Sequence, residues 1–180
     1  MSTNPTAQKV IQQAESNPGV RWAGGVAIST AILAGVAAIA GLLANRHTTE
    51  AMIDQIECSD QWSYYQAKGI KAAVLENKLE LLPILGKTAE VDDKDKAERY
   101  RTEQEGIKAA AEAKQTSAKD HRRRAGIAAN AATLSQIAIA LAAISMLTKR
   151  VWFWIGSLAF GAAGLGILIY SVLADGPNRF

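Results

Sequence analysis

Residues 22–44 read WAGGVAISTAILAGVAAIAGLLA and carry no charged side chain. Because a helix rises about 1.5 Å per residue, a segment of this length is sufficient to cross a hydrocarbon core of about 30 Å. We interpret it as a first transmembrane helix, preceded by a polar tail at residues 1–21. A cleaved signal peptide is the alternative, since Ala38 and Ala40 resemble a cleavage site. The apolar run is longer than a typical signal core, which favours the uncleaved anchor.

Two further charge-free segments, residues 125–147 and 151–174, are separated only by residues 148–150. Each is long enough to span a bilayer, so the pattern predicts a second and a third transmembrane helix joined by a tight turn. A short polar tail, residues 175–180, follows. Small residues that permit close helix approach stand four positions apart in the first and last spans. The pairs are Ala31 and Gly35, Ala37 and Gly41, Ser157 and Gly161, and Ala162 and Gly166.

Residues 45–124 are polar and lie between the first and second spans. No proline or glycine follows residue 44 at once, so the first helix is predicted to continue to the breaker LPILG at residues 82–86. The acidic segment 90–95 suits the first turn of another helix, because negative charge there complements the helix dipole. Both limbs are then on the order of 35 residues long, about 50 Å as helix. Equal limbs are what a chain needs to leave and re-enter one membrane surface.

The sequence therefore predicts an all-α membrane protein: three transmembrane helices, with a long antiparallel helical hairpin projecting from the membrane between the first and second. Small and apolar residues recur on both limbs at three- and four-residue spacing, as in a coiled coil. Other positions in register are polar, so a single hairpin buries little apolar area. We therefore expect it to need a partner, most simply a second copy. The two stripes are Cys58, Trp62, Tyr65, Gly69, Ala72 and Leu79, and Ala97, Tyr100, Ile107, Ala111, Ala118 and Ala125, with polar Gln104, Lys114 and His121 in register.

Composition and motifs argue against several classes of function. The chain has 180 residues, 49% of them hydrophobic and placed in long blocks, and a net charge of +3. Acidic and basic residues alternate through the polar segment and leave no purely basic face, which argues against nucleic-acid binding. Cys58 is the one cysteine, so no intramolecular disulfide is possible and no cysteine-based metal pattern is present. Phosphate loops, nucleophile elbows and zinc-protease motifs are missing, so we expect no catalytic residue, no enzyme activity and no cofactor.

Aromatic residues outside the apolar spans cluster in the motif SDQWSYYQAKGIK, residues 59–71. Aromatic faces with polar edges suit recognition of a partner or a small molecule, and they also suit packing between helices of an oligomer. Packing is the favoured interpretation. As the bulkiest stripe residues, Trp62 and Tyr65 are expected to contribute most to it. The candidate patch comprises Asp60, Gln61, Trp62, Tyr64, Tyr65 and Lys68.

The sequence resembles the bacterial membrane proteins grouped as domain of unknown function family 4337. The resemblance lies in this motif, in the preceding RHTTE at residues 46–50 and in LTKRVW at residues 147–152, and it covers roughly residues 22–174. It implies three membrane helices and a bacterial source. It transfers no activity and no functional residue to this chain.

The two histidines, His47 and His121, are predicted near the membrane end of the hairpin, on different limbs. A metal-binding or pH-sensing pair is one interpretation of them. No companion carboxylate cluster is evident in the sequence, so we expect no metal site.

Polar residues near and within the spans are the remaining candidates. The run of Arg122, Arg123 and Arg124 is expected to contact anionic lipid headgroups, at roughly 1 kcal/mol per charge. Asn130 and Gln136 are the most polar residues inside the spans, which contain no Asp, Glu, Lys or Arg. That lack argues against a pump, and a hydrogen bond between helices is the expected role of Gln136.

We expect a self-associating structural or scaffold protein whose other contacts are membrane lipids. One alternative is a passive channel, formed where several copies bring Asn130, Thr133 and Gln136 to a shared axis. The other is an adaptor that binds an unidentified protein through the aromatic patch. Positive charges near the span ends are more numerous on the hairpin side. This favours a cytoplasmic hairpin, although the Lys149-Arg150 turn favours the opposite orientation. With the bacterial source that the family resemblance implies, we expect a multi-pass protein of the inner membrane.

Overall fold

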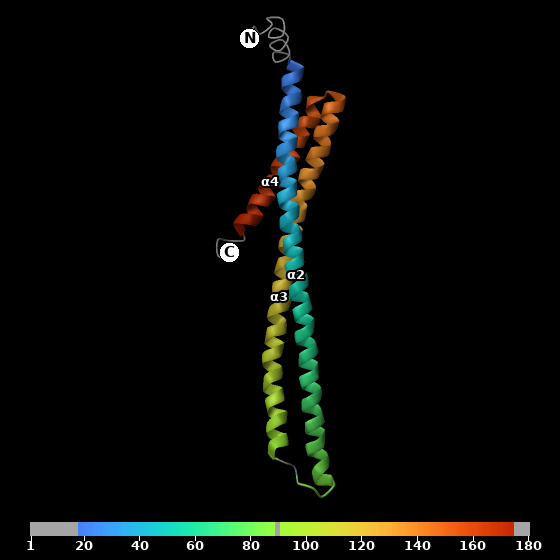
Figure 1. The fold of residues 1–180 in the computed structure, drawn as a ribbon, viewed down its shortest axis with the longest axis vertical. Coiled ribbons are helices and arrows are strands. Elements are labelled where there is room, and N and C mark those ends of the chain that lie inside the picture. The colour runs from blue at the N-terminus through green and yellow to red at the C-terminus, as the bar shows by residue number, and fades with distance from the viewer. Residues whose placement is uncertain (1–17, 89–90, 175–180) are drawn as a thin grey trace, which may run out of the picture. The chain divides into compact units, whose positions relative to one another are not determined.

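A computed structural model describes residues 18–88 and 91–174, and the side chains at positions 22–88 and 92–173. The described residues form three helices and no strand: α2 spans Pro18–Ile84, α3 spans Val91–Thr148 and α4 spans Val151–Ala174 (Figure 1). The prediction of an all-helical chain with three long helices is thus confirmed. Residues 1–17 and 175–180 of the predicted polar tails lie outside the described part. α2 begins at Pro18 and not at residue 22, because the fixed φ of proline suits the first turn of a helix.

The end of α2 is set by the breaker that the sequence analysis identified. Gly86 has a φ of 68°, which glycine adopts without steric cost. Its backbone N–H donates to the carbonyl of Pro83 at 3.1 Å, and that of Lys87 donates to the carbonyl of Leu82 at 2.9 Å. This pair of hydrogen bonds is the Schellman arrangement, and it satisfies carbonyls that the helix leaves open. The predicted continuation of the first helix and its stop are both confirmed.

α3 begins with Asp92 and Asp93 in its first turn, where carboxylates complement the helix dipole. It runs without a break to Thr148. The turn into α4 contains Lys149 with a φ of 53°, the left-handed conformation that closes a helix. Here the Ser145 hydroxyl donates to the carbonyl of Arg150 at 3.1 Å. The predicted short connection between the last two helices is confirmed.

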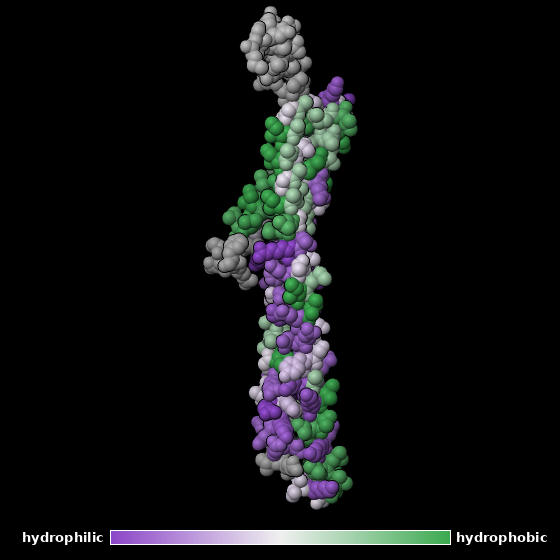
Figure 2. Space-filling model, in the orientation of Figure 1, coloured by the Kyte–Doolittle hydropathy of each residue, from purple (hydrophilic) through white to green (hydrophobic). Residues whose placement is uncertain are grey.

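Each helix contains a stretch that is long and apolar enough to cross a membrane, judged by length and composition. The stretches fall within Trp22–Ile84, Asp92–Thr148 and Val151–Leu173. Large apolar side chains such as Leu42 and Leu173 are exposed along them. Figure 2 shows α4 covered largely by hydrophobic residues, in green.

The chain divides into two compact units. Unit 1 contains α2 up to Arg46, α3 from Arg124 onward, and α4. Unit 2 contains residues 47–123, that is, the polar parts of α2 and α3. α2 and α3 lie side by side along unit 2 (Figure 1).

Unit 1 is packed through small residues. A Cβ at Gly164 on α4 would lie 2.9 Å from the Ser135 hydroxyl and 3.1 Å from the Ala131 carbonyl on α3, so any larger residue there requires its neighbours to shift. A Cβ at Gly161 would overlap the Leu33 side chain of α2. Of the predicted small-residue pairs, Ser157 and Gly161 are buried. Ala37 is half-buried, and the other members are exposed: Ala31, Gly35, Gly41, Ala162 and Gly166. Close packing of helices by small residues is the usual arrangement where lipid removes the hydrophobic driving force.

Unit 2 has a narrow seam between α2 and α3. Its buried small residues recur every seventh position, as in a coiled coil. Several members of the predicted stripes are only half-buried. The buried apolar residues of the seam are Ala51, Cys58 and Ala72 on α2 and Ala97, Ala111 and Ala118 on α3, and the half-buried members are Trp62, Tyr65, Gly69, Leu79, Tyr100 and Ile107. The seam therefore contributes little apolar burial, as the sequence indicated.

Candidate functional site

Polar side chains line one edge of the seam in unit 2, and they also recur at seven-residue intervals. On α2 these positions are His47, Asp54, Gln61 and Lys68, and on α3 they are Asp93, Tyr100, Lys114 and His121, with Ile107 between. His47, Asp54 and Asp93 are buried, as is Gln104. Buried polar residues at coiled-coil positions specify register and partner more than they add stability.

Ion pairs also connect α2 to α3 along unit 2. As the residue number falls on α2, it rises on α3, so the pairs define one register for the two helices. Each pair lies within unit 2. They are Lys78 with Asp93, Glu76 with Arg101, Lys68 with Glu103, Asp54 with Lys114, and Glu50 with His121.

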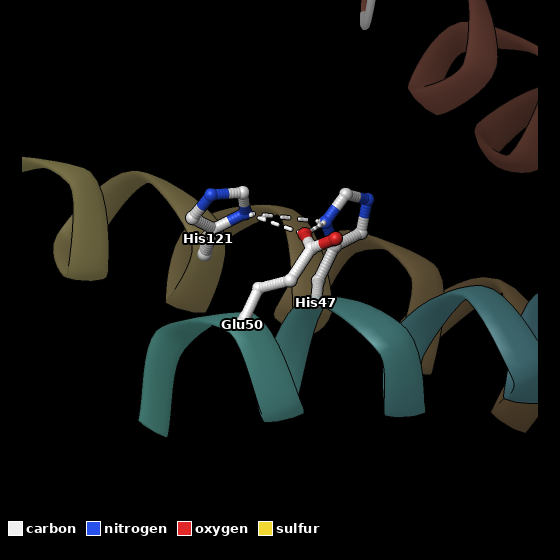
Figure 3. Close-up of side chains that lie close together, drawn as sticks. All are labelled: His47, Glu50 and His121. Atoms are coloured by element: carbon white, nitrogen blue, oxygen red, sulfur yellow. Dashed lines mark hydrogen bonds and ion pairs between the residues drawn. The ribbon is translucent and has the colours of Figure 1, made fainter. Parts of the chain in front are cut away.

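The side chains of His47, Glu50 and His121 converge on one point (Figure 3). The Nδ1 atoms of His47 and His121 lie 3.4 Å apart, with ring centroids at 5.7 Å. The Glu50 Oε2 atom lies 3.3 Å from Nδ1 of His47 and 3.0 Å from Nδ1 of His121. His47 and Glu50 stand three residues apart and so share one face of α2. The three donor atoms all lie within 4.8 Å of one another, a separation that allows them to hold one metal ion.

Asp54 lies next to this cluster, seven residues beyond His47 on α2. Its Oδ2 atom is 3.9 Å from Nε2 of His121, and its Oδ1 atom is 3.2 Å from the Lys114 ammonium. A hydrogen bond from Ser117, together with Lys114, lowers the pKa of Asp54 below its ordinary value although burial opposes the change. The pKa of Lys114 is raised by its hydrogen bonds to Glu57 and Asp54. A charged carboxylate therefore faces the far nitrogen of His121.

The aromatic patch predicted from the sequence also lies in unit 2, and its six residues fall into two groups. Trp62 packs edge-on against Tyr65 with ring centroids 5.4 Å apart, and both are half-buried. The Lys68 ammonium lies 5.4 Å from the Tyr64 ring and 4.7 Å from the Tyr100 ring, and it pairs with Glu103. This contact raises the pKa of Lys68, chiefly through the hydrogen bond to Glu103.

The other members of the patch face a different direction. Asp60 and Gln61 line a shallow groove in unit 2 together with Lys114 and two alanines of α3. Asp60 is exposed and Gln61 is half-buried. The six predicted residues thus form a packed aromatic and lysine contact plus a separate groove edge, and not one continuous site.

The remaining candidates lie on α3 and are mostly exposed. Arg122 and Arg123 are exposed and Arg124 is half-buried. Asn130 and Gln136 are both exposed on unit 1, as is Thr133, whose hydroxyl donates to the Ala129 carbonyl at 2.9 Å. Gln136 is exposed on unit 1, and the hydrogen bond between helices expected of it stays a prediction.

Sequence reasoning missed the carboxylates of the histidine cluster. It found His47 and His121 and judged them to lack companions, whereas the structure brings Glu50 to both rings and Asp54 to one. The available signal was the seven-residue spacing of His47 and Asp54 and the three-residue spacing of His47 and Glu50, which place all three on the inner face of one helix.

These features define a helical protein with three helices of membrane-crossing length and composition and a polar two-helix unit. A family described as a domain of unknown function, DUF4337, matches residues 22–174, and the chain belongs to that family. No curated protein and no solved structure matches the chain.

Proposed function

We propose that the chain is a non-enzymatic, self-associating structural protein of the bacterial inner membrane. In this proposal residues 22–44, 125–147 and 151–174 cross the bilayer. Unit 2 projects from it as an antiparallel helical hairpin. Support comes from the apolar stretches of all three helices and from the opposed numbering of the α2 and α3 ion pairs.

The hairpin is assigned to the cytoplasmic side. Arg46 and Arg122–Arg124 stand at the ends of the proposed spans, and positive charge there is retained in the cytoplasm. The exposed Arg122 and Arg123 are suited to anionic headgroups. Attachment of a reporter enzyme after residue 86, active only in one compartment, tests this orientation.

An interrupted apolar stripe on the outward face of α2 carries the proposal of self-association. Its large side chains form two groups, residues 53–56 and residues 70–84, which are separated by the exposed polar residues Asp60 and Ser63. All of them are at least half exposed. They are Ile53, Ile56, Ile70, Val74, Leu81 and Ile84, with exposed fractions of 50, 59, 65, 61, 55 and 79%. Large apolar side chains gathered on one exposed helix face are typical of an association surface.

A second copy is the partner that best fits the stripe. Between residues 92 and 123, the described part of α3 has no exposed large apolar side chain, so apolar surface is confined to one face of unit 2. Two α2 stripes related by a two-fold axis bury each other in the manner of a coiled coil. Asn130 and Gln136 add a second argument, since an amide exposed in an apolar helix finds a hydrogen-bond partner when a neighbouring chain covers it.

The particle mass in mild detergent, measured by native mass spectrometry, tests the proposal. Ile70→Glu combined with Val74→Glu is expected to reduce the particle to a monomer. Ala109→Glu combined with Ala113→Glu places the same charges, also four residues apart, on exposed positions of α3 and is expected to leave the mass unchanged. A monomeric wild-type protein, or equal masses for both variants, overturns the assignment. A wild-type monomer that captures a different protein through this stripe favours the adaptor alternative.

A further inference from the structure

We propose that His47, Glu50 and His121 bind one divalent transition-metal ion of the zinc class and so connect α2 to α3. The site lies within unit 2, and the proposal does not depend on self-association. Its three ligands come from two helices, a pair on α2 and a single histidine on α3 (Figure 3).

The spacing of the donor atoms matches a tetrahedral metal site. Zinc lies about 2.0–2.1 Å from histidine nitrogens and about 2.0–2.2 Å from carboxylate oxygens. Two ligands of a tetrahedron with these bond lengths are therefore about 3.3–3.4 Å apart. The three separations in this cluster are 3.0, 3.3 and 3.4 Å. One ion placed above the triangle of donor atoms reaches all three with little movement of the side chains.

Asp54 supplies an independent argument. Histidines that bind metals commonly direct their second ring nitrogen to a carboxylate, which fixes the ring and strengthens the ligand. Nε2 of His121 faces Oδ2 of Asp54 at 3.9 Å, an ion-pair separation longer than a hydrogen bond, and Asp54 is itself held by Lys114. The Asp54 side chain is buried, so it acts as a positioning group and not as a solvent-exposed charge.

The donor set selects the metal class. Imidazole nitrogens bind zinc, copper and nickel, whereas magnesium and calcium require oxygen ligands. Three protein ligands leave a fourth tetrahedral position for water or another small ligand. Because two ligands belong to α2 and one to α3, bound metal stabilises the folded pair of helices over the separated ones.

The experiment uses full-length protein in mild detergent, with any histidine tag removed, since the chain itself has only two histidines. After stripping with a chelator, Zn²⁺ and Mg²⁺ are titrated calorimetrically, and Co²⁺ is added as a spectroscopic probe. We expect one Zn²⁺ per chain, no binding of Mg²⁺, and a visible Co²⁺ spectrum of tetrahedral intensity. Asp54→Asn should weaken Zn²⁺ binding about 10- to 100-fold and alter the Co²⁺ spectrum. Glu50→Gln and His121→Ala, which remove ligands, should weaken it further.

Glu112→Gln is the control for Glu50→Gln, because it makes the same chemical change at an exposed position of α3. It should leave Zn²⁺ affinity and the Co²⁺ spectrum unchanged. Circular dichroism of each variant establishes that helix content is retained. The proposal is overturned if wild type binds no Zn²⁺, or if His121→Ala with intact helices binds it as tightly as wild type. In either case the cluster is a hydrogen-bonded network only.

Discussion

Gln104 of α3 occupies the space that Gly69 of α2 leaves open. The Gln104 side-chain amide donates to the backbone carbonyl of Tyr65 at 3.1 Å, and a Cβ on Gly69 would overlap the Gln104 Nε2 atom. Gln104 is buried, so this hydrogen bond satisfies a polar group that water does not reach. A glycine that costs α2 about 1 kcal/mol in helix propensity is thereby explained by its neighbour on α3.

A double-mutant cycle tests this relationship. In a Gln104→Ala background, Gly69→Ala should stabilise unit 2 by about 1 kcal/mol, because only helix propensity changes. In the wild-type background the same substitution should stabilise less or destabilise, since Gln104 must leave its hydrogen bond. We expect a coupling free energy of about 0.5–3 kcal/mol. Buried Cys58, the one cysteine of the chain, reports opening of the seam through its rate of thiol labelling. Additive effects of the two substitutions would contradict the contact.

Gly164 should be the least replaceable glycine of α4. Gly164→Ala sets a methyl group 3.1 Å from a backbone carbonyl of α3, so the two helices must shift apart, and overpacking of this kind costs about 1–3 kcal/mol. Gly166→Ala meets no atom within 4 Å and should be neutral or slightly stabilising. Thermal melting followed by circular dichroism in detergent compares the two. Equal midpoints for both variants would mean that α4 does not approach α3 at Gly164.

The ion pairs of unit 2 predict a loss of stability in acid. Arg101 donates to both carboxylate oxygens of Glu76, at 2.9 and 2.7 Å, and this pairing lowers the pKa of Glu76 from its ordinary value of 4.5. The hydrogen bond from Lys68 lowers the pKa of Glu103 in the same way. A carboxyl group whose pKa is lower in the folded state stabilises the fold fully at pH values above its unfolded-state pKa. That contribution is lost as the pH falls through the folded-state pKa.

The measurement is the melting midpoint of the protein between about pH 5 and pH 3. This window begins just above the ordinary glutamate pKa of 4.5 and extends below it, because the folded-state pKa values of Glu76 and Glu103 are lowered. Wild type should lose stability over this range. Glu76→Gln combined with Glu103→Gln should start from a lower midpoint at pH 5 and lose less on acidification. An identical acid dependence in wild type and the double variant would show that these pairs do not contribute.

The sequence predicted the helices well because their signals are local. Charge-free length, the LPILG breaker and the acidic first turn each act within a few residues, and α2, α3 and their ends follow from them. Side-chain partners across the seam depend on the register of two helices far apart in sequence. That register is set by pairs such as Lys68 with Glu103, which no local pattern reveals.

The packing role of Trp62 also depends on the register of the two helices. From its bulk alone, Trp62 is expected to contribute most to packing between the two limbs. In the structure it is half-buried and packs against Tyr65 of its own helix. The fully buried positions of unit 2 include Ala72 and Ala111, whose small size gave little indication of their importance.

Ala111 should therefore tolerate enlargement worst. Its side chain has 0% exposure in a seam of small residues, so Ala111→Leu forces α2 and α3 apart and costs about 1–3 kcal/mol or more. Ala109→Leu is the control, since Ala109 is exposed two positions away and the same leucine there displaces nothing. Labelling of Cys58 should accelerate strongly in Ala111→Leu and stay at the wild-type rate in Ala109→Leu. Hydrogen exchange in residues 125–147 and 151–174 should be unchanged in both variants, because those segments belong to unit 1. Equal labelling rates for the two leucine variants would show that the helices of unit 2 do not meet at Ala111.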